Sequence, residues 1–278
     1  MDLRKLLTTV LALVVLGGVV LYALHESQAR QPLRVISFNV LGGFRDGISR
    51  HDRAVAWVAG QQPDIVALQE LNDYTDEKLK EDARQWGHEH TVLLPVPSGF
   101  HLGLTSREPI DKVRTSTEKG IWHGVLQART FGLDVTVVHL APKLEDVRMP
   151  ETTLVLEQLA KWNPEKRQGI LLGDFNSPAR SDASYYQENG LDWPFNVMDR
   201  YLASGWVDVV AYHQGVMNRN TISIPTQLVE APGISGRIDY ILATDELAAK
   251  CTSARVVNEE DTHLLSDHYP VVAEFDWQ

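Results

Sequence analysis

The chain has 278 residues, with 26 Lys and Arg against 37 Asp and Glu, which gives a formal charge of −11 at pH 7. Its hydrophobic content of 44% and charged content of 23% are ordinary for a globular protein and exclude wholesale disorder. The acidic excess gives no sign of the dominant basic patch of a nucleic-acid binder, although a local patch is not excluded. The single cysteine, Cys251, excludes an internal disulfide framework and any metal site built from several cysteines.

The amino terminus carries an uncharged apolar segment. Leu6 to Leu24 is a run of 19 residues without a charge, and Arg4 and Lys5 precede it. At about 1.5 Å per residue, a helix of this length spans roughly 28 Å, close to the thickness of a bilayer core. An uncleaved membrane anchor explains the length best, and the alternative is a signal peptide cleaved near Ala29. In both cases the basic residues predict a cytoplasmic amino terminus and place the rest of the chain outside the cytoplasm.

The chain therefore divides into two regions. Residues 1–30 are the predicted anchor or signal segment, and residues 31–278 are one predicted domain, because no repeat or long interior linker divides them. Without the first region the domain holds 23 basic and 35 acidic side chains, a charge of −12. A domain of this length can bury a substantial core.

From Leu33 onwards, short apolar runs rich in β-branched residues alternate with turns. The predicted strands are Leu33–Phe38, Asp64–Leu68, Thr91–Pro95, His101–Ser106, Lys112–Ser116, Val125–Thr130, Leu133–Leu140, Gly169–Leu172, Ile238–Ala243, Ala254–Asn258 and Val271–Phe275. The predicted helices are Ser49–Gln61, Asp76–Gly87 and Arg148–Trp162. Val155, Leu159 and Trp162 share one face of the last helix. This pattern predicts an α/β domain built on two stacked sheets with helices outside.

Polar side chains recur where the predicted strands stop. They are Asn39, Glu70, His139, Asp174, Asn176, Asp239, Asp267 and His268. Singly, each is best explained as a turn or hydrogen-bonding residue. Together they indicate a site, because strand ends at one edge of a sheet converge in space. Asp174 and Asn176, two residues apart, point the same way if the chain stays extended.

The residue types in this set indicate a reaction. Oxygen ligands without thiolates suit Mg²⁺, Mn²⁺ or Ca²⁺ better than zinc. Two histidines among carboxylates allow one to act as a general base, oriented by an acid, while the other binds an anionic oxygen. The chemistry indicated is metal-assisted attack of water on a phosphate ester.

Six sequence blocks carry these residues in order. They are Ser37-Phe-Asn39-Val, Leu68-Gln-Glu70, Val138-His139-Leu, Gly173-Asp174-Phe-Asn176, Arg237-Ile-Asp239-Tyr-Ile and Ser266-Asp267-His268-Tyr-Pro. This order resembles the signature of the endonuclease/exonuclease/phosphatase superfamily, the deoxyribonuclease I-like fold, over about residues 33–276. The expected architecture is thus α/β, with two stacked mixed β-sheets flanked by helices. It is a four-layer α/β/β/α sandwich, preceded by one N-terminal transmembrane or signal helix.

The resemblance implies roles for the matched positions. Glu70 is the expected principal metal ligand, with Asn39 beside it and Asp267 in the metal site or next to it. The expected ion is Mg²⁺, with Mn²⁺ or Ca²⁺ as alternatives, and one or two metals are both compatible. His268 is the expected general base, and Asp239 is expected to hold its imidazole in the correct tautomer.

Three further positions complete the implied site. Asp174 is expected to orient the nucleophile or assist proton transfer. Asn176 and a protonated His139 are expected to donate hydrogen bonds to the phosphoryl oxygens as charge builds in the transition state. Arg107, in a block that looks like Ser-Arg-x-Pro-Ile, is a candidate substrate contact, and a structural salt bridge is its alternative. The loop Ser177–Pro194 is the best candidate for substrate selection.

Family membership fixes the bond broken and leaves the substrate open. Phospholipid headgroups, small molecules and nucleic acids are all candidates, and no protein partner is inferred. His139 stands where apurinic endonucleases usually carry Tyr, which argues against that branch. The hypothesis is a membrane-anchored, metal-dependent phosphodiesterase outside the cytoplasm. The alternatives are an extracytoplasmic nuclease and a catalytically silent binding module.

Overall fold

A computed structural model describes residues 32–44, 48–142, 144–215, 221–228 and 235–277. The predicted anchor or signal segment, residues 1–30, lies outside the described residues. No helix within the described ranges is long and apolar enough to cross a membrane. Residues Leu33–Trp277 form one compact unit.

Two six-stranded sheets make up this unit. The first sheet contains, in spatial order, β11 (Cys251–Val256), β12 (Val271–Phe275), β1 (Leu33–Asn39), β2 (Ile65–Gln69), β4 (Leu102–Ser106) and β3 (His90–Leu94). The second sheet contains β5 (Asp111–Ser116), β6 (Val125–Thr130), β7 (Leu133–His139), β8 (Gly169–Asp174), β10 (Asp239–Thr244) and β9 (Trp206–Asp208).

Both sheets are mixed, and each has one parallel pair near its centre. β1 runs parallel to β2 in the first sheet, and β7 runs parallel to β8 in the second. β12 is antiparallel to β1, and β10 is antiparallel to β8. The carboxyl ends of the parallel strands therefore lie beside the amino ends of β12 and β10.

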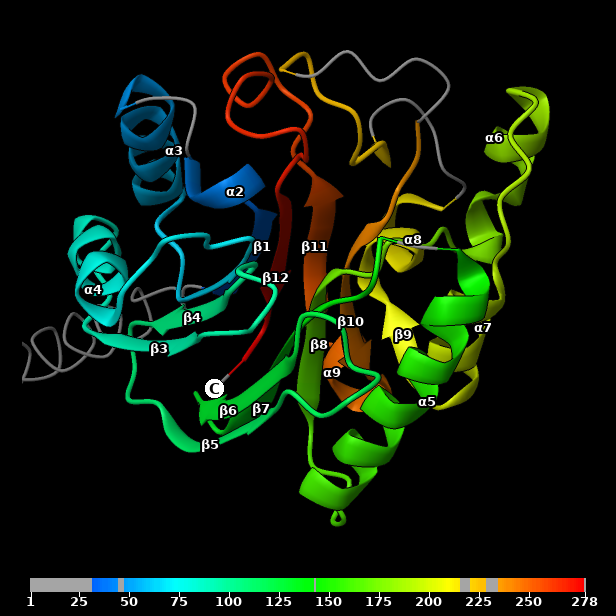
Figure 1. Ribbon diagram of the computed structural model, residues 1–278, viewed down its shortest axis with the longest axis horizontal. Helices are drawn as coiled ribbons and strands as arrows, with labels where there is room; N and C mark the ends of the chain where they lie inside the picture. The colour runs from blue at the N-terminus through cyan, green and yellow to red at the C-terminus, as the bar shows by residue number, and fades with distance from the viewer. Residues whose placement is uncertain (1–31, 45–47, 143, 216–220, 229–234, 278) are drawn as a thin grey trace, which may run out of the picture. The chain divides into compact units, whose positions relative to one another are not determined.

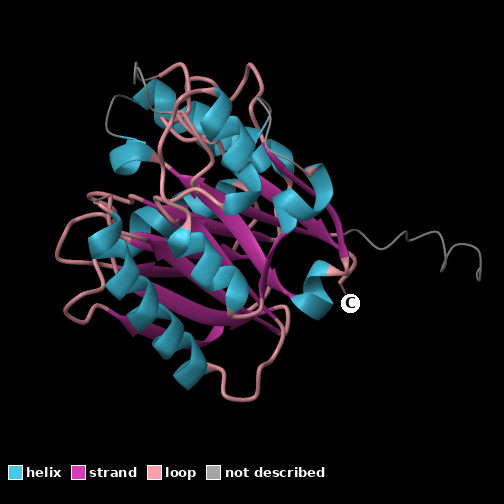
Figure 2. Ribbon diagram, turned by 90° about the vertical axis from the view of Figure 1, so that its right-hand side faces the viewer, coloured by secondary structure: helices cyan, strands magenta, loops and turns pink. Residues whose placement is uncertain are grey.

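Helices lie outside the strands, as Figures 1 and 2 show. The helical segments are α2 (Leu41–Phe44), α3 (Ile48–Gln61), α4 (Asp76–Gln85), α5 (Glu145–Trp162), η1 (Arg180–Asp182), α6 (Ala183–Glu188), α7 (Asn196–Ala203), α8 (Val209–Gln214) and α9 (Asp245–Ala248). In Figure 1, α3 and α4 lie on one side of the sheets, and α5 and α7 lie on the other.

Three layers of core explain why these segments fold this way. Val35 and Ile170 point into a layer that both sheets share. Their neighbours Ile36 and Leu171 point outward, the first toward α3 and α4 and the second toward α5 and α7. Because side chains alternate along a strand, a strand buried on both faces reads as a continuous apolar run. That is why these strands are visible in the sequence.

The structure confirms the predicted α/β fold with two mixed sheets and flanking helices. All eleven predicted strands and all three predicted helices are present with small shifts at their ends. Sequence analysis missed the three-residue strand β9 and the short helices. Two of those, η1 and α6, lie inside the segment Ser177–Pro194 that was predicted as a loop. Segments of three to eight residues are too short for periodicity to reveal.

Candidate functional site

The sheet topology brings the predicted polar residues to one edge. Asn39 pairs with Gln69 at the ends of β1 and β2. His139 pairs with Asp174 at the ends of β7 and β8, and Asp174 also faces Asp239 at the start of β10. Ser37 of β1 pairs with Val271, so the segment that carries Asp267 and His268 enters β12 at the same edge. Sequence analysis predicted this convergence, and the register explains it.

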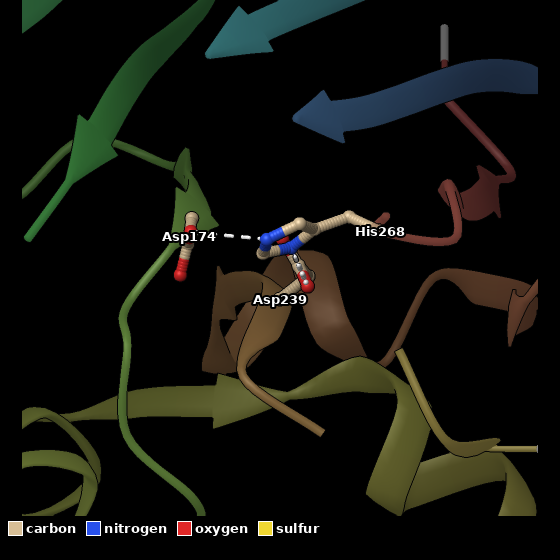
Figure 3. A group of neighbouring side chains, drawn as sticks. All are labelled: Asp174, Asp239 and His268. Carbon is tan, nitrogen blue, oxygen red and sulfur yellow. Dashed lines mark hydrogen bonds and ion pairs between the residues drawn. The ribbon is translucent and has the colours of Figure 1, made fainter. Parts of the chain in front are cut away.

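At the centre of this edge, the carboxylates of Asp174 and Asp239 lie beside the imidazole ring of His268 (Figure 3). His268 Nδ1 lies 2.9 Å from Asp239 Oδ2, within hydrogen-bond distance. The other ring nitrogen, Nε2, lies 3.8 Å from Asp174 Oδ2 and 4.0 Å from Asp267 Oδ1. An imidazole that donates Nδ1–H to a carboxylate keeps Nε2 available for proton transfer. This is the geometry that sequence analysis expected for His268 and Asp239.

Asn39 joins the two halves of the site. Its Nδ2 donates to Glu70 Oε1 and to Asp174 Oδ2, each at 3.1 Å. The second oxygen of Glu70 accepts the backbone N–H of Gly42 at 3.0 Å. A tight turn makes this contact: Glu70 has φ of 61°, and a Cβ on Gly43 would lie 2.2 Å from the carbonyl oxygen of Asn72. The turn therefore requires glycine at that position.

The two predicted hydrogen-bond donors also lie at this edge. His139 Nε2 lies 3.4 Å from Asp174 Oδ2 and 4.0 Å from Glu70 Oε1. Asn176 donates its backbone N–H to Asp174 Oδ1 at 2.8 Å and an amide hydrogen to the Leu140 carbonyl at 2.9 Å. Asn176 adopts φ of 50°, so the chain turns after β8. The chain does not stay extended after Asp174, because the aspartate side chain closes a turn on the asparagine N–H.

The close approach of β7 and β8 depends on the glycine before Asp174. Gly173 has φ of 139°, and a Cβ there would lie 1.9 Å from the carbonyl oxygen of Val138. Any side chain would push the two strands apart just before His139 and Asp174. Close packing at the site thus requires the glycine of the Gly-Asp-Phe-Asn block.

Burial shifts the proton equilibria of these groups. Burial raises the pKa of Asp174 to about 8, with the Asp239 charge acting in the same direction. Burial alone lowers the pKa of His268, but the carboxylates of Asp239 and Asp174 outweigh it and hold that pKa well above its usual range. Both shifts favour the protonated forms of Asp174 and His268, and groups this close do not titrate independently.

His139 behaves in the opposite way. It is 3% exposed, and burial holds its pKa well below the usual range, with His123 and His268 adding to the effect. Burial therefore favours the neutral form of His139 over the protonated form that was expected from the sequence. A neutral ring still donates one N–H to an anionic oxygen.

His123 is a neighbour of the site that sequence analysis left unassigned. Its ring stacks on His139 with centroids 4.2 Å apart and an interplanar angle of 22°. Its Nδ1 lies 2.9 Å from Ser98 Oγ, and the edge of Phe100 contacts both imidazoles. No sequence pattern predicts this stack, because 16 residues and a strand separate the two histidines.

Arg237 fixes the start of β10. Its guanidinium is 1% exposed and forms ion pairs with Asp182 Oδ2 at 3.0 Å and Asp208 Oδ2 at 2.7 Å. Its backbone N–H donates to the hydroxyl of Tyr186. These contacts tie η1, α6 and the end of β9 to the residue two positions before Asp239. Arg237 therefore anchors the chain just before the strand that carries Asp239.

Arg107 lies away from the site. Its Nη2 forms an ion pair with Asp64 Oδ1 at 2.6 Å, just before β2 begins, whereas Glu70 follows the end of β2. The two positions are at opposite edges of the first sheet. The structure therefore shows the salt bridge that was the alternative explanation, and it does not bring Arg107 to the other predicted residues.

The site has the donors that a divalent cation requires. Ligand atoms of Asp174, Asp239 and His268 all lie within 4.8 Å of one another, and all three residues are buried. Asp239 Oδ1 is buried and accepts no hydrogen bond within the described chain. The one cysteine, Cys251, pairs with Phe275 at the opposite edge of the first sheet. Carboxylate oxygens and imidazole without thiolate fit Mg²⁺ or Mn²⁺.

Comparisons with solved structures agree on the fold. An AP endonuclease from Archaeoglobus fulgidus is 21% identical, with a TM-score of 0.68 over 88% of this chain and 99% of that chain. The Neisseria 3′ phosphatase NExo, solved with a product DNA hairpin, is 22% identical, with a TM-score of 0.69 over 88% and 100% of the chains. A mannosyl-6-phosphatase from Bacteroides thetaiotaomicron is 16% identical, with a TM-score of 0.65 over 88% and 100%.

No curated protein matches the chain. The sequence profile of the Endonuclease/Exonuclease/phosphatase family matches residues 36–268, which hold the first five blocks in full and the sixth as far as His268. The chain belongs to the endonuclease/exonuclease/phosphatase family and is a phosphoesterase of that fold.

Proposed function

We propose that this protein hydrolyses a phosphodiester with a divalent cation and a water molecule activated by His268. The observation that carries the proposal is the hydrogen bond between His268 Nδ1 and Asp239, with Nε2 directed toward Asp174. An acid–imidazole pair of this kind takes a proton at a defined atom.

Each residue of the site has its own role in this hydrolysis. His268 accepts the proton of water at Nε2, and Asp239 keeps the Nδ1 proton in place. Asp174, 3.8 Å from Nε2, orients the water and takes part in proton transfer. His139 and one amide hydrogen of Asn176 donate to the phosphoryl oxygens, where negative charge builds in the transition state.

A divalent cation fits beside these groups. Glu70, Asn39 and Asp267 would hold it. Asp174 and Asp239, whose ligand atoms lie within 4.8 Å of each other and of a His268 nitrogen, are further carboxylates of the same site. When bound, the cation supplies positive charge that stabilises the phosphoryl oxygens and offsets the carboxylates that keep the pKa of His268 high.

The location is part of the proposal. Residues 1–30 would anchor the enzyme in a membrane, with residues 31–278 outside the cytoplasm. The support is the length of the uncharged run Leu6–Leu24 and the basic residues before it. A substrate at or near a membrane surface, such as a phospholipid headgroup, suits this placement.

An extracytoplasmic nuclease is the second candidate. The observation that favours it is the likeness in fold to an enzyme that was solved with a product DNA hairpin. The charge of −12 on residues 31–278 argues against it, because a polyanion approaches an acidic domain slowly.

A panel of substrates tests both candidates. The purified chain is incubated with Mg²⁺, Mn²⁺ or Ca²⁺ and plasmid DNA, RNA, sphingomyelin, a phosphoinositide or an aryl phosphodiester. Turnover of the aryl ester together with a lipid or small-molecule ester supports the proposal. Robust nicking of DNA without lipid hydrolysis would establish the nuclease. Absence of turnover with every substrate, unchanged in His268→Ala, would establish a silent binding module.

A further inference from the structure

A cavity of about 490 Å³ opens beside His268 and Asn176. Its other lining residues include Glu145, Arg148, Asp192, Trp193 and Asp267. This volume is that of a small-molecule pocket. A phosphate ester bound at the site has organic substituents on its phosphorus, and the cavity is the space next to the reacting groups that can receive one of them.

One wall of the cavity is aromatic and supported from behind. Trp193 packs on Tyr186 with ring centroids 6.0 Å apart and an interplanar angle of 36°. Tyr186 is 1% exposed, and its hydroxyl accepts the backbone N–H of Arg237 at 3.1 Å. The indole therefore rests on the core beneath the site. A supported indole offers a flat apolar surface to a ring.

Another wall carries an acceptor and a donor one turn apart on α5. Arg148 is 7% exposed, and its Nε donates to Ser177 Oγ at 2.8 Å while Nη1 donates to the Ala141 carbonyl at 3.3 Å, which fixes the guanidinium plane. Glu145 lies three residues earlier, and its Oε1 is buried and accepts no hydrogen bond from the described residues. A buried carboxylate oxygen without a donor is costly unless a ligand supplies one.

The charges of the lining select against most ligands. Glu145 and Asp192 repel a further phosphate, and the guanidinium of Arg148 weakens the attraction of these carboxylates for an ammonium group. A hydroxyl group can bind both charged groups, because its O–H donates to a carboxylate and its oxygen accepts from a guanidinium.

We infer that this cavity binds an uncharged, hydroxyl-bearing ring of the substrate, a sugar or a cyclitol, next to the reacting phosphate. The ring lies against Trp193, and its hydroxyls contact Glu145 and Arg148. The inference rests on the proposed function and names the substrate class of that same site. It also gives the segment Ser177–Pro194 a defined part in substrate selection, since that segment supplies Trp193.

Equilibrium binding tests the inference independently of turnover. The full chain with Mg²⁺ is titrated by calorimetry with five phosphates: myo-inositol monophosphate, glucose monophosphate, ethyl phosphate, phosphocholine and a thymidine dinucleotide. Inhibition constants for the same compounds are measured against aryl phosphodiester hydrolysis. We expect a hydroxylated ring phosphate to bind about tenfold more tightly than ethyl phosphate, the effect of one or two well-placed hydrogen bonds. The inositol and glucose compounds distinguish a cyclitol from a sugar.

Two variants locate the preference. Trp193→Ala and Glu145→Gln should each reduce the preference to less than about threefold, with a much smaller effect on the binding of ethyl phosphate. Trp193→Ala removes the surface for the ring, and Glu145→Gln leaves the hydroxyl a neutral amide oxygen, which is a weaker acceptor than a carboxylate. Asp146→Asn is the matched control: it makes the same charge change in the same turn of α5, at an exposed residue that does not line the cavity. It should keep the full preference.

The outcomes separate the inference from the proposed function. Equal binding of all five phosphates, or tighter binding of phosphocholine or the dinucleotide, overturns the inference even if the enzyme turns over. A loss in Trp193→Ala or Glu145→Gln that is equal for ring and ethyl phosphates also overturns it, since it would reflect structure alone. Selective binding without hydrolysis of any ester would support the cavity assignment and reject the proposed function.

Discussion

The acidic residues at the two edges of the sheets have different partners. At the edge away from the site, arginine neutralises them: Asp64 pairs with Arg107, and Glu274 with Arg34. Asp134 has two arginine partners there. At the site edge, the ion pairs of Glu70, Asp174, Asp239 and Asp267 within the described chain are with His139 and His268 only.

This difference separates the acids that arginine side chains neutralise from the acids whose charge a bound cation would neutralise. Burying carboxylates without a permanent cation is unfavourable, and the raised pKa of Asp174 reports that cost. At the far edge, arginine side chains offset this cost of burying carboxylates. At the site edge the cost remains, and a bound divalent cation would offset it. A site assembled this way gains stability when its ion binds.

Removal of the divalent cation should have the largest effect. With a chelator, turnover of an aryl phosphodiester should fall to background, and Mg²⁺ or Mn²⁺ should restore it. At about 100 times its dissociation constant, the ion should stabilise the fold by about 2.7 kcal/mol and raise the melting temperature by roughly 5–10 °C. Scanning calorimetry with and without Mn²⁺ measures the rise.

Two variants at opposite edges test where the ion binds. Glu70→Gln should abolish most of the Mn²⁺-dependent rise, because it removes the carboxylate of the expected principal metal ligand. Asp64→Asn makes the same change from carboxylate to amide at the far edge and should keep the rise. An equal rise in Glu70→Gln and the unmodified chain would place the ion elsewhere.

His268→Ala should have the next largest effect. Loss of a general base lowers turnover by about 10²–10⁴-fold. His90→Ala is the control, since His90 pairs with Ser106 at the far edge of the first sheet. Steady-state kinetics with saturating Mg²⁺ measures both variants. A decrease of less than about tenfold in His268→Ala would mean that another group accepts the proton.

Glu151 of α5 allows a test of carboxylate burial at a residue outside the proposed catalytic and metal-binding set. It is 1% exposed and accepts the backbone N–H groups of Trp122 and Ala141 at 2.6 and 2.8 Å. Burial raises its pKa to about 7. The folded state therefore holds this proton where the unfolded state has lost it. The stability that the proton contributes is complete below the unfolded pKa and is lost as pH rises through about 7.

Glu151→Gln should remove this pH dependence. Between about pH 4.5 and 7, the unfolding free energy of the unmodified chain should fall relative to that of the variant by on the order of 3 kcal/mol. Urea denaturation across that range measures the difference. Glu157→Gln, at an exposed position of the same helix, is the control. Parallel pH profiles for the unmodified chain and Glu151→Gln would contradict the expectation.

The fold was predictable from the sequence for a physical reason. Val35, Ile36, Ile170 and Leu171 are buried on alternate faces, so their strands read as apolar runs. The site was predictable because polar residues stop those runs at one edge. No local sequence pattern contains the register of the strands. The pairing of β4 with β2 places Arg107, which follows β4, at the edge opposite the site.

Other features depend on contacts between distant segments. The turn at Asn176 comes from a side chain of β8 closing on the backbone, and the stack of His123 on His139 joins two segments on either side of β6. The cavity at Trp193 requires α5 and residues 192–194 to meet. Sequence patterns report local periodicity, so they pointed to the segment 177–194 without revealing which residue faces the cavity.

Arg107→Ala should have the smallest effect, and it decides between the two explanations for this residue. The side chain is 58% exposed, and an ion pair so exposed stabilises a protein by about 0.5 kcal/mol. In the variant, the Asp64 carboxylate would still accept a hydrogen bond from the backbone N–H of Arg34, which lies 2.8 Å away, so it would not be left without a partner. We therefore expect a small loss of stability in urea denaturation and unchanged kcat and KM. A KM raised about tenfold with unchanged stability would instead mean that Arg107 contacts the substrate, and the two edges would then not be separate in function.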